Sequence, residues 1–175
     1  MSNAELASLI DLVASCFAID ERIFTSLIRK ESTFNMGAKS PTGAAGLTQM
    51  TGTGIDEVND QLGKRGTSYA LSSATQYFNN TLSECVSGYV GAPWVQLWDR
   101  GTTLGAQKTE ISSDAVTALV YGAILLKTNL SVERTDNPNA SMEQLYRNAL
   151  RRYNGDPSEK ENYQQNIMTS AGTDF

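Results

Sequence analysis

Glu31 is the residue whose type and position most clearly suggest chemistry. It follows Leu27 by four residues and Ile28 by three and precedes Phe34 by three, so on a helix it falls on the apolar stripe that faces the core. Burial and the nearby helix end both raise the pKa of such a carboxyl group. A glutamic acid that stays protonated near neutral pH can act as a general acid. The spacing also allows a glutamate at the edge of the stripe, paired with a basic neighbour or turned to solvent.

The composition excludes several other chemistries. The 175 residues include no histidine, which removes serine and cysteine triads built on histidine and all histidine metal sites. Fourteen Lys and Arg against nineteen Asp and Glu give a net charge of −5, which argues against nucleic acid as a partner. Cys16 and Cys85 lack metal-ligand spacing; a disulfide between them stays open, and we favour two buried thiols. No metal or organic cofactor is implied.

The elements that must position Glu31 are helical. Apolar residues recur at steps of three and four, which predicts an all-α chain, or α+β at most through a small hairpin. We expect one domain over 1–175, with no membrane insertion and no export signal at the start of the chain. The helices are expected over 6–17, from Asp20 to 34, over 55–62 and 70–86, from Asp114, and after capping boxes at Ser141 and Ser158 to about 153 and 168. The glycine-rich stretches 35–53 and 87–111 predict a loop and a loop or short hairpin, respectively.

Several short motifs around Glu31 occur together at a fixed spacing. They are Glu-Ser at 31–32, Ser-Pro-Thr-Gly at 40–43 and Gly-Leu-Thr-Gln at 46–49, followed late in the chain by Gly-Ala at 122–123 and Tyr-Asn-Gly at 153–155. This combination resembles the soluble lytic transglycosylase family. The resemblance covers the first fifty and the last sixty residues, and the segment around 57–110 does not align.

The resemblance implies a lysozyme-like helical domain that cleaves the β-1,4 bond between N-acetylmuramic acid and N-acetylglucosamine in peptidoglycan glycan strands. Glu31 would act as acid and then as base, leaving a 1,6-anhydro end without a second carboxylate, unlike the usual carboxylate-pair glycosidases. The residues that the same resemblance assigns to substrate binding are Ser40, Gln49, Thr51, Tyr153, Asn154 and Tyr163.

Three departures from the family pattern put the product and the substrate contacts in question. Thr48 replaces a methionine before Gln49, Thr51 stands where a further methionine is common, and Arg152 replaces alanine before the Tyr-Asn pair. A hydrolytic muramidase on the same fold stays open, as do a non-catalytic wall-binding domain and a chitin-active relative. A muramidase would need a second carboxylate to activate water, and the candidates are Asp56, Asp60, Asp99 and Glu110.

Other features leave two interpretations each. Trp94 and Trp98, four residues apart, suit either a sugar-stacking face or core anchors of a glycine-rich loop. The basic residues of the late helix, Arg147, Arg151 and Arg152, suit either contact with an anionic wall or a solvated face.

We expect the protein to be a monomer. Without an export signal, the pattern suits a phage endolysin or virion enzyme acting on the bacterial wall, and it leaves the cellular location undecided.

Overall fold

The computed structural model describes residues 1–63, 73–92, 94, 96–97 and 103–172. These residues form helices and loops. One loop contains two isolated antiparallel β-bridges, Lys39 with Ala45 and Ala45 with Met50, and the described part of the chain contains no β-strand beyond these bridges. The chain is therefore all-α, as its periodicity predicts. The helices are α1 Asn3–Cys16, α2 Glu21–Ser32, α3 Gly52–Gln61, α5 Ser73–Thr81, the π-helical η1 Leu82–Val86, α6 Ser87–Val90, α7 Leu104–Ile111, α8 Ala115–Asp136, α9 Met142–Tyr153 and α10 Lys160–Ala171.

The first two helices begin where side chains satisfy their free backbone N–H groups. Ser2 and Glu5 form a capping box at the start of α1, which the sequence analysis did not predict. Asp20 caps α2 as predicted, because its carboxylate accepts from the backbone N–H of Arg22 at 3.0 Å and of Ile23 at 3.2 Å. The apolar face of α2 is fully buried, which places Glu31 at the edge of that face.

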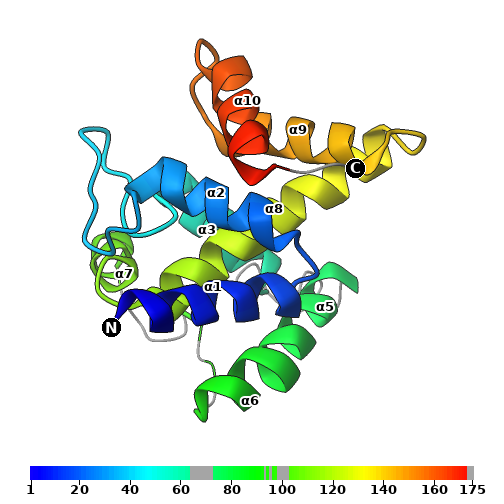
Figure 1. The fold of residues 1–175 in the computed structure, drawn as a ribbon. Helices are drawn as coiled ribbons and strands as arrows, with labels where there is room; N and C mark the ends of the chain where they lie inside the picture. Colours follow the sequence, from blue (N-terminus) through cyan, green and yellow to red (C-terminus); the bar gives the residue numbers. More distant parts are fainter. Residues whose placement is uncertain (64–72, 93, 95, 98–102, 173–175) are drawn as a thin grey trace.

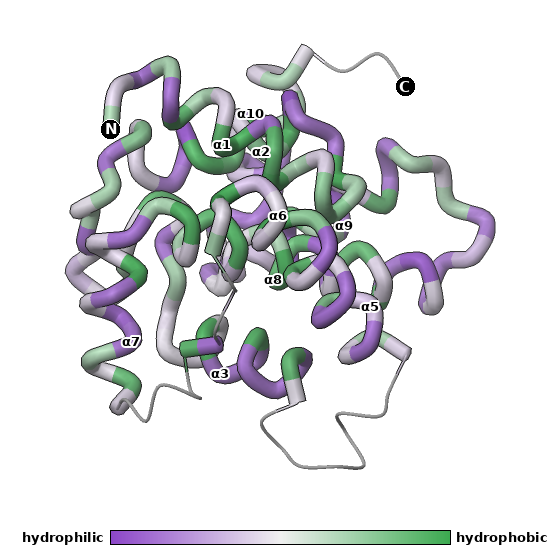
Figure 2. The backbone as a smooth tube through the Cα atoms, turned by 90° about the horizontal axis from the view of Figure 1, so that it is seen from below, coloured by the Kyte–Doolittle hydropathy of each residue, from purple (hydrophilic) through white to green (hydrophobic). Residues whose placement is uncertain are grey.

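Helix α8 is the central element of the core. Asp114 caps it as predicted, and nearly all of its first half is buried. In Figure 2 it lies among the other helices rather than at the edge of the molecule. With 22 residues, α8 is long and apolar enough to cross a membrane by length and composition, and this length was not predicted from the sequence. However, 61% of its apolar segment is buried inside the protein. The packing against the other helices accounts for its composition.

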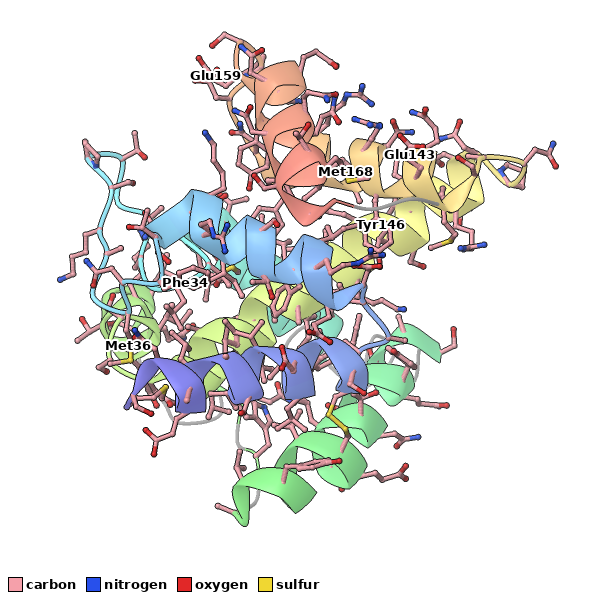
Figure 3. All side chains as sticks on the ribbon, in the orientation of Figure 1. Phe34, Met36, Glu143, Tyr146, Glu159 and Met168 are labelled. Carbon is pink, nitrogen blue, oxygen red and sulfur yellow. A yellow bond between two sulfur atoms is a disulfide. The ribbon has the colours of Figure 1, made fainter. Side chains whose placement is uncertain are left out.

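Helices α9 and α10 form a layer on one side of α2 and α8, while α5 and α6 lie on the other side (Figure 1). Figure 3 shows Glu143 on α9 and Glu159 at the outer end of α10, within a surface rich in charged side chains. The arginines of α9 form ion pairs on this surface and remain partly exposed, so they are not a free basic patch. Their carboxylate partners are Glu143 for Arg147, Glu161 for Arg151, and Glu133 with Asp136 for Arg152.

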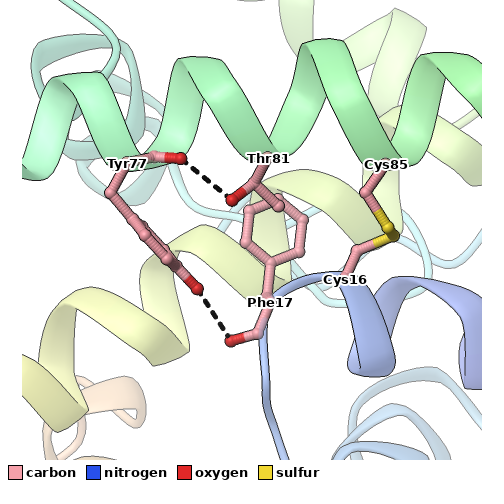
Figure 4. The surroundings of a disulfide bond; sticks show 5 residues. All are labelled: Cys16, Phe17, Tyr77, Thr81 and Cys85. Carbon is pink, nitrogen blue, oxygen red and sulfur yellow. Dashed lines mark hydrogen bonds between the residues drawn. A yellow bond between two sulfur atoms is a disulfide. The ribbon is translucent and has the colours of Figure 1, made fainter.

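Cys16 and Cys85 form a disulfide, so the expectation of two thiols was wrong. The bond joins the end of α1 to η1 across 69 residues, with the two Cα atoms 5.7 Å apart. Beside it, the Tyr77 hydroxyl donates to the Phe17 carbonyl at 3.3 Å (Figure 4). The chain therefore fastens α1 to the α5–η1 segment by covalent and polar contacts together.

Two local predictions were also wrong. The stretch 87–111 contains helices α6 and α7 in its described parts, where a loop or hairpin was expected. Ser158 does not cap α10, because its hydroxyl donates to Asp156 and the helix begins after Glu159 without a side-chain cap. Ser141 does cap α9, accepting from the Gln144 N–H at 3.2 Å.

Candidate active site

Glu31 lies in the last turn of α2, where that helix faces α10. Its side chain is partly buried, and the Tyr163 hydroxyl of α10 donates a hydrogen bond to its Oε1 atom. Tyr163 itself is 6% exposed, so the interaction is shielded from bulk water. The pair joins residues 132 positions apart and sets the orientation of the carboxyl group.

The pKa of Glu31 is raised from its ordinary value of 4.5 to about 7. The cause is burial, which disfavours the charged carboxylate. The Tyr163 hydrogen bond and the positive charge of Lys30 act in the opposite direction, but burial outweighs both. At neutral pH the carboxyl group is therefore present in both protonation states, as a group that must first give and then take a proton requires.

Tyr153, the last residue of α9, is a second tyrosine close to Glu31. Its hydroxyl donates to the backbone carbonyl of Thr48 at 2.9 Å and lies 3.7 Å from the sulfur of Met50. Burial, and then the negative charge of Glu31, raise its pKa far above the ordinary range, so it stays a neutral donor. The structure thus brings Glu31, Tyr153 and Tyr163 together from three helices.

The loop between α2 and α3 is held mainly by its own polar groups. The Gln49 amide nitrogen donates to the carbonyls of Ala38 at 3.0 Å and Gly46 at 2.9 Å. Gln49 has φ +46°, a left-handed conformation that is rare for residues other than glycine. These two bonds offset that strain and fix the position of Gln49 at the end of the loop.

The remaining predicted site residues make local contacts. The Ser40 hydroxyl accepts from the Ala44 N–H and hydrogen-bonds the Thr42 hydroxyl, each at 2.9 Å. Thr51 caps α3 by accepting from the Gly54 N–H at 3.1 Å. Asn154 ends α9 and accepts from the Asp156 N–H at 3.0 Å. None of these contacts joins the residue to Glu31, and their binding of substrate stays a prediction.

Thr48 and Gly122 form a contact whose role the sequence analysis did not identify. Thr48 is fully buried, and its hydroxyl donates to the Ala118 carbonyl of α8 at 2.8 Å. A Cβ atom at Gly122 would lie 2.4 Å from the Thr48 methyl group, so this glycine is what allows the loop to approach α8. The replacement of methionine by threonine at 48 and the Gly-Ala pair at 122–123 were the visible signals.

Among the residues that the structure describes, no carboxylate contributes to the pKa shift of Glu31. Asp60 is 7% exposed on α3, and Asp60, Asp56 and Glu110 each have interactions of their own. Asp99 lies outside the described residues. The candidates for a water-activating base therefore gain no support from the electrostatics of Glu31.

Trp94 contacts the core rather than presenting a free aromatic face. Its ring centroid lies 6.4 Å from that of Tyr121, a fully buried residue of α8, and its backbone N–H donates to Ser87 at 2.8 Å. The position favours the core-anchor interpretation for Trp94, and Trp98 lies outside the described residues. Within the described part of the chain, no group of three acidic or cysteine side chains could hold a metal ion.

The fold and the site together define an all-α, lysozyme-like domain with one buried glutamic acid flanked by two tyrosines. The profile of the family described as Transglycosylase SLT domain matches residues 8–97, just over half of the chain. The chain belongs to this family, whose activity is the lytic cleavage of peptidoglycan. The match includes Glu31 and extends into the segment around 57–110 that the motifs did not align, but it ends before Tyr153 and Tyr163. No curated protein and no solved structure matches the chain.

Proposed function

We propose that the protein is a lytic transglycosylase that breaks the β-1,4 bond between N-acetylmuramic acid and N-acetylglucosamine with Glu31 as its acid and base. Protonated Glu31 gives its proton to the glycosidic oxygen, and the bond from that oxygen to C1 of the muramoyl residue breaks with help from its N-acetyl group. The Glu31 carboxylate then takes the proton of the muramoyl 6-hydroxyl. That oxygen bonds to C1 and closes the 1,6-anhydro ring without consuming water.

The observation that carries the proposal is the pKa of Glu31, raised to about 7 by burial. A carboxyl group with this pKa is an effective acid in one step and an effective base in the next at neutral pH. Tyr163 holds one carboxyl oxygen, which leaves the other for the substrate. No second carboxylate acts on Glu31 among the described residues, which favours the anhydro outcome over water activation.

In this proposal the other predicted site residues either contact the glycan strand or hold the loop beside it. Tyr153, Tyr163 and Asn154 contact the sugar at the scissile bond, and Gln49 supports the facing loop through its bonds to Ala38 and Gly46. Ser40 and Thr51 act by fixing that loop and the start of α3. One continuous core runs from α1 to α10, which supports the proposal of one domain over 1–175, and we propose that it acts as a monomer.

The test is mass spectrometry of fragments released from purified peptidoglycan by the wild-type protein, Glu31→Gln and Glu21→Gln. Glu21 is exposed at the opposite end of α2, so its variant is a matched control for the same substitution. We expect anhydro-muramoyl ends from the wild type and from Glu21→Gln. For Glu31→Gln we expect the cleavage rate to fall by at least about a thousandfold, which is above the lower limit of roughly a hundredfold that a general acid–base step contributes.

The other outcomes separate the alternatives. Reducing ends, one water heavier, would replace the transglycosylase by a muramidase. Release from chitin and not from peptidoglycan would move the substrate to a related polymer. An absence of fragments from peptidoglycans of several types would leave a wall-binding domain, and undiminished cleavage by Glu31→Gln would exclude this mechanism.

A further inference from the structure

A cavity lined by residues of α5 and α8 lies apart from Glu31. It has a volume of about 370 Å³. One of its lining residues, Lys127, contacts Ala18 just before α2, whereas Glu31 lies in the last turn of α2. The eleven helical residues from Glu21 to Glu31 lie between these points and give a rise of about 15 Å. The residues that line the cavity include Tyr77 and Phe78 of α5 and Lys127, Thr128, Ser131 and Val132 of α8.

Lys127 brings a partly buried positive charge into this cavity. Its ammonium group donates to the Ala18 carbonyl at 3.2 Å and lies 6.0 Å from the centre of the Tyr77 ring. Burial lowers its pKa, and the like charge of Arg134 lowers it further. Within the described residues no carboxylate pairs with this ammonium, and the neighbours that it does contact are a neutral carbonyl and a ring. A cation in this setting gains more from an anionic ligand than an exposed lysine does.

Two hydroxyl residues of α8 line the same cavity as Lys127. The Thr128 hydroxyl oxygen is buried and has no hydrogen-bond partner, which is costly for a polar atom. Ser131 lines the same cavity one helical turn further along α8. An ammonium group and hydroxyl donors on one wall suit a carboxylate, which accepts several hydrogen bonds at once.

The side formed by α5 is mainly apolar, although Ser73 and, from α3, Gln61 also line the cavity. Phe78 is 3% exposed and belongs to the core, while Tyr77 of α5 and Val132 of α8 remain 39% and 38% exposed at the rim. A ligand that fills the cavity therefore carries a small apolar group beside its carboxylate.

We propose that this cavity, the Lys127 pocket, is a second binding site that takes a carboxylate carried on a small apolar group, such as the carboxyl-terminal end of a short peptide. On peptidoglycan these ends belong to the peptide stems, and this identification of the occupant rests on the proposed function. Because the Lys127 contact with Ala18 and the Glu31 carboxyl group lie at opposite ends of α2, about 15 Å apart along the helix, the pocket can hold a stem while a glycan strand occupies the active site. The second contact keeps the enzyme on its polymer between cleavage events.

The test is a titration of the ¹⁵N-labelled protein with D-alanyl-D-alanine, followed by the backbone amide shifts of Tyr77, Thr128 and Ser131. The matched ligand control is the carboxyl-terminal amide of the same dipeptide, which keeps both methyl groups and lacks the charge. We expect saturable shifts at these residues with the acid and at least tenfold weaker binding of the amide.

Variants assign the contact to its side chains. Lys127→Gln is expected to weaken binding at least tenfold, Lys127→Arg to retain most of it, and Thr128→Val to weaken it severalfold. Lys160→Gln, which removes a charge at the start of α10, is the matched control and is expected to bind as the wild type does. Thr128→Val also keeps the test decisive if Lys127→Gln does not fold.

The results separate this site from the proposed activity. Glu31→Gln is expected to bind the dipeptide normally, so loss of cleavage with intact binding leaves the pocket in place. Equal binding of acid and amide, unchanged binding by Lys127→Gln, or shifts confined to residues around Glu31 would each overturn the proposal, whatever the fragments from peptidoglycan show.

Discussion

At the scale of single residues, burial and the Tyr163 hydrogen bond act in opposite directions on the pKa of Glu31. A pKa shift from 4.5 to about 7 corresponds to roughly 3 kcal/mol in favour of the protonated form. A hydrogen bond to a charged group contributes about 1.5–3 kcal/mol in the other direction. Tyr163 therefore moderates the effect of burial instead of cancelling it, and it keeps the pKa near neutral rather than above it.

Tyr163→Phe removes that moderating hydrogen bond. Because the bond lowers the pKa of Glu31, its loss raises the pKa further above 7. The alkaline limb of the activity profile, where Glu31 loses its proton, is expected to move to higher pH, and the maximal rate to fall about tenfold as the carboxyl group loses its orientation. The pH dependence of kcat/KM checks this. Tyr146→Phe, which alters a hydroxyl bound to the Asp20 N–H at the other end of α2, is expected to leave the profile in place.

Glu31→Gln is expected to change stability in a direction set by the same shift. A folded pKa above the unfolded one means that the native state binds more protons between pH 4.5 and 7, so the wild type loses stability as the pH rises through this range. Because Glu31 is only partly buried, we expect Glu31→Gln to gain about 2 kcal/mol, or roughly 4–8 °C in Tm, over the wild type at pH 8. The gain disappears below pH 4.5. Thermal unfolding at both pH values measures it, and an equal gain at both would contradict the assigned pKa.

At the scale of elements, the loop between α2 and α3 connects Glu31 to the core. Thr48 anchors the loop on α8 through its hydroxyl, and its carbonyl accepts from Tyr153 at the end of α9. Two helices, α8 and α9, thus contact one residue of the loop that follows Glu31. A change in the approach of the loop to α8 is expected to affect both stability and catalysis.

Gly122→Ala tests that approach. Alanine favours a helix interior by about 1 kcal/mol over glycine, but the new Cβ would lie 2.4 Å from the Thr48 methyl, and Thr48 is held by its bond to Ala118. The clash is expected to win and to destabilise the protein by about 1–3 kcal/mol in denaturant unfolding. Gly88→Ala on α6 is the matched control, since nothing lies within 4 Å of its Cβ, and it is expected to be neutral or stabilising. Combining Gly122→Ala with Thr48→Ser, which keeps the hydroxyl and removes the methyl, should restore part of the loss.

Much of this arrangement follows from the sequence where the signal is local. Asp20, Asp114 and Ser141 cap helices as their side chains predict, and the apolar spacing places Glu31 at the buried edge of α2. Helix α7 was not predicted because it has no apolar stripe: its buried residues are Gln107 and Ile111, and only the second is apolar. The Tyr163 contact with Glu31 spans 132 residues, so spacing could not supply it, and the family resemblance pointed to the tyrosine without its hydrogen bond.

At the scale of the whole molecule, the helices share one core, and the disulfide fastens one side of it. Residues from all the described helices except α6 belong to the same buried cluster. The bond from Cys16 to Cys85 lies on the side of α5 and η1, away from the layer of α9 and α10 that covers Glu31. Spacing could not predict this pairing, because two cysteines 69 residues apart meet only once the tertiary structure is formed.

The double substitution Cys16→Ser and Cys85→Ser measures what this covalent contact contributes. Closing a loop of this length restricts the unfolded chain by about 4 kcal/mol in the chain-entropy treatment, and measured losses are commonly about 2–4 kcal/mol. The neighbouring contacts remain, since the Tyr77 hydroxyl still reaches the Phe17 carbonyl and the Phe17 and Phe78 rings stay 6.3 Å apart. We therefore expect the variant to stay folded at 25 °C with a Tm lower by roughly 5–15 °C.

Dithiothreitol should lower the Tm of the wild type and leave that of the variant unchanged. The fragments released from peptidoglycan should also keep the same ends, because the bond is remote from Glu31. If the reductant lowered both Tm values equally, the disulfide would not be the source of this stability.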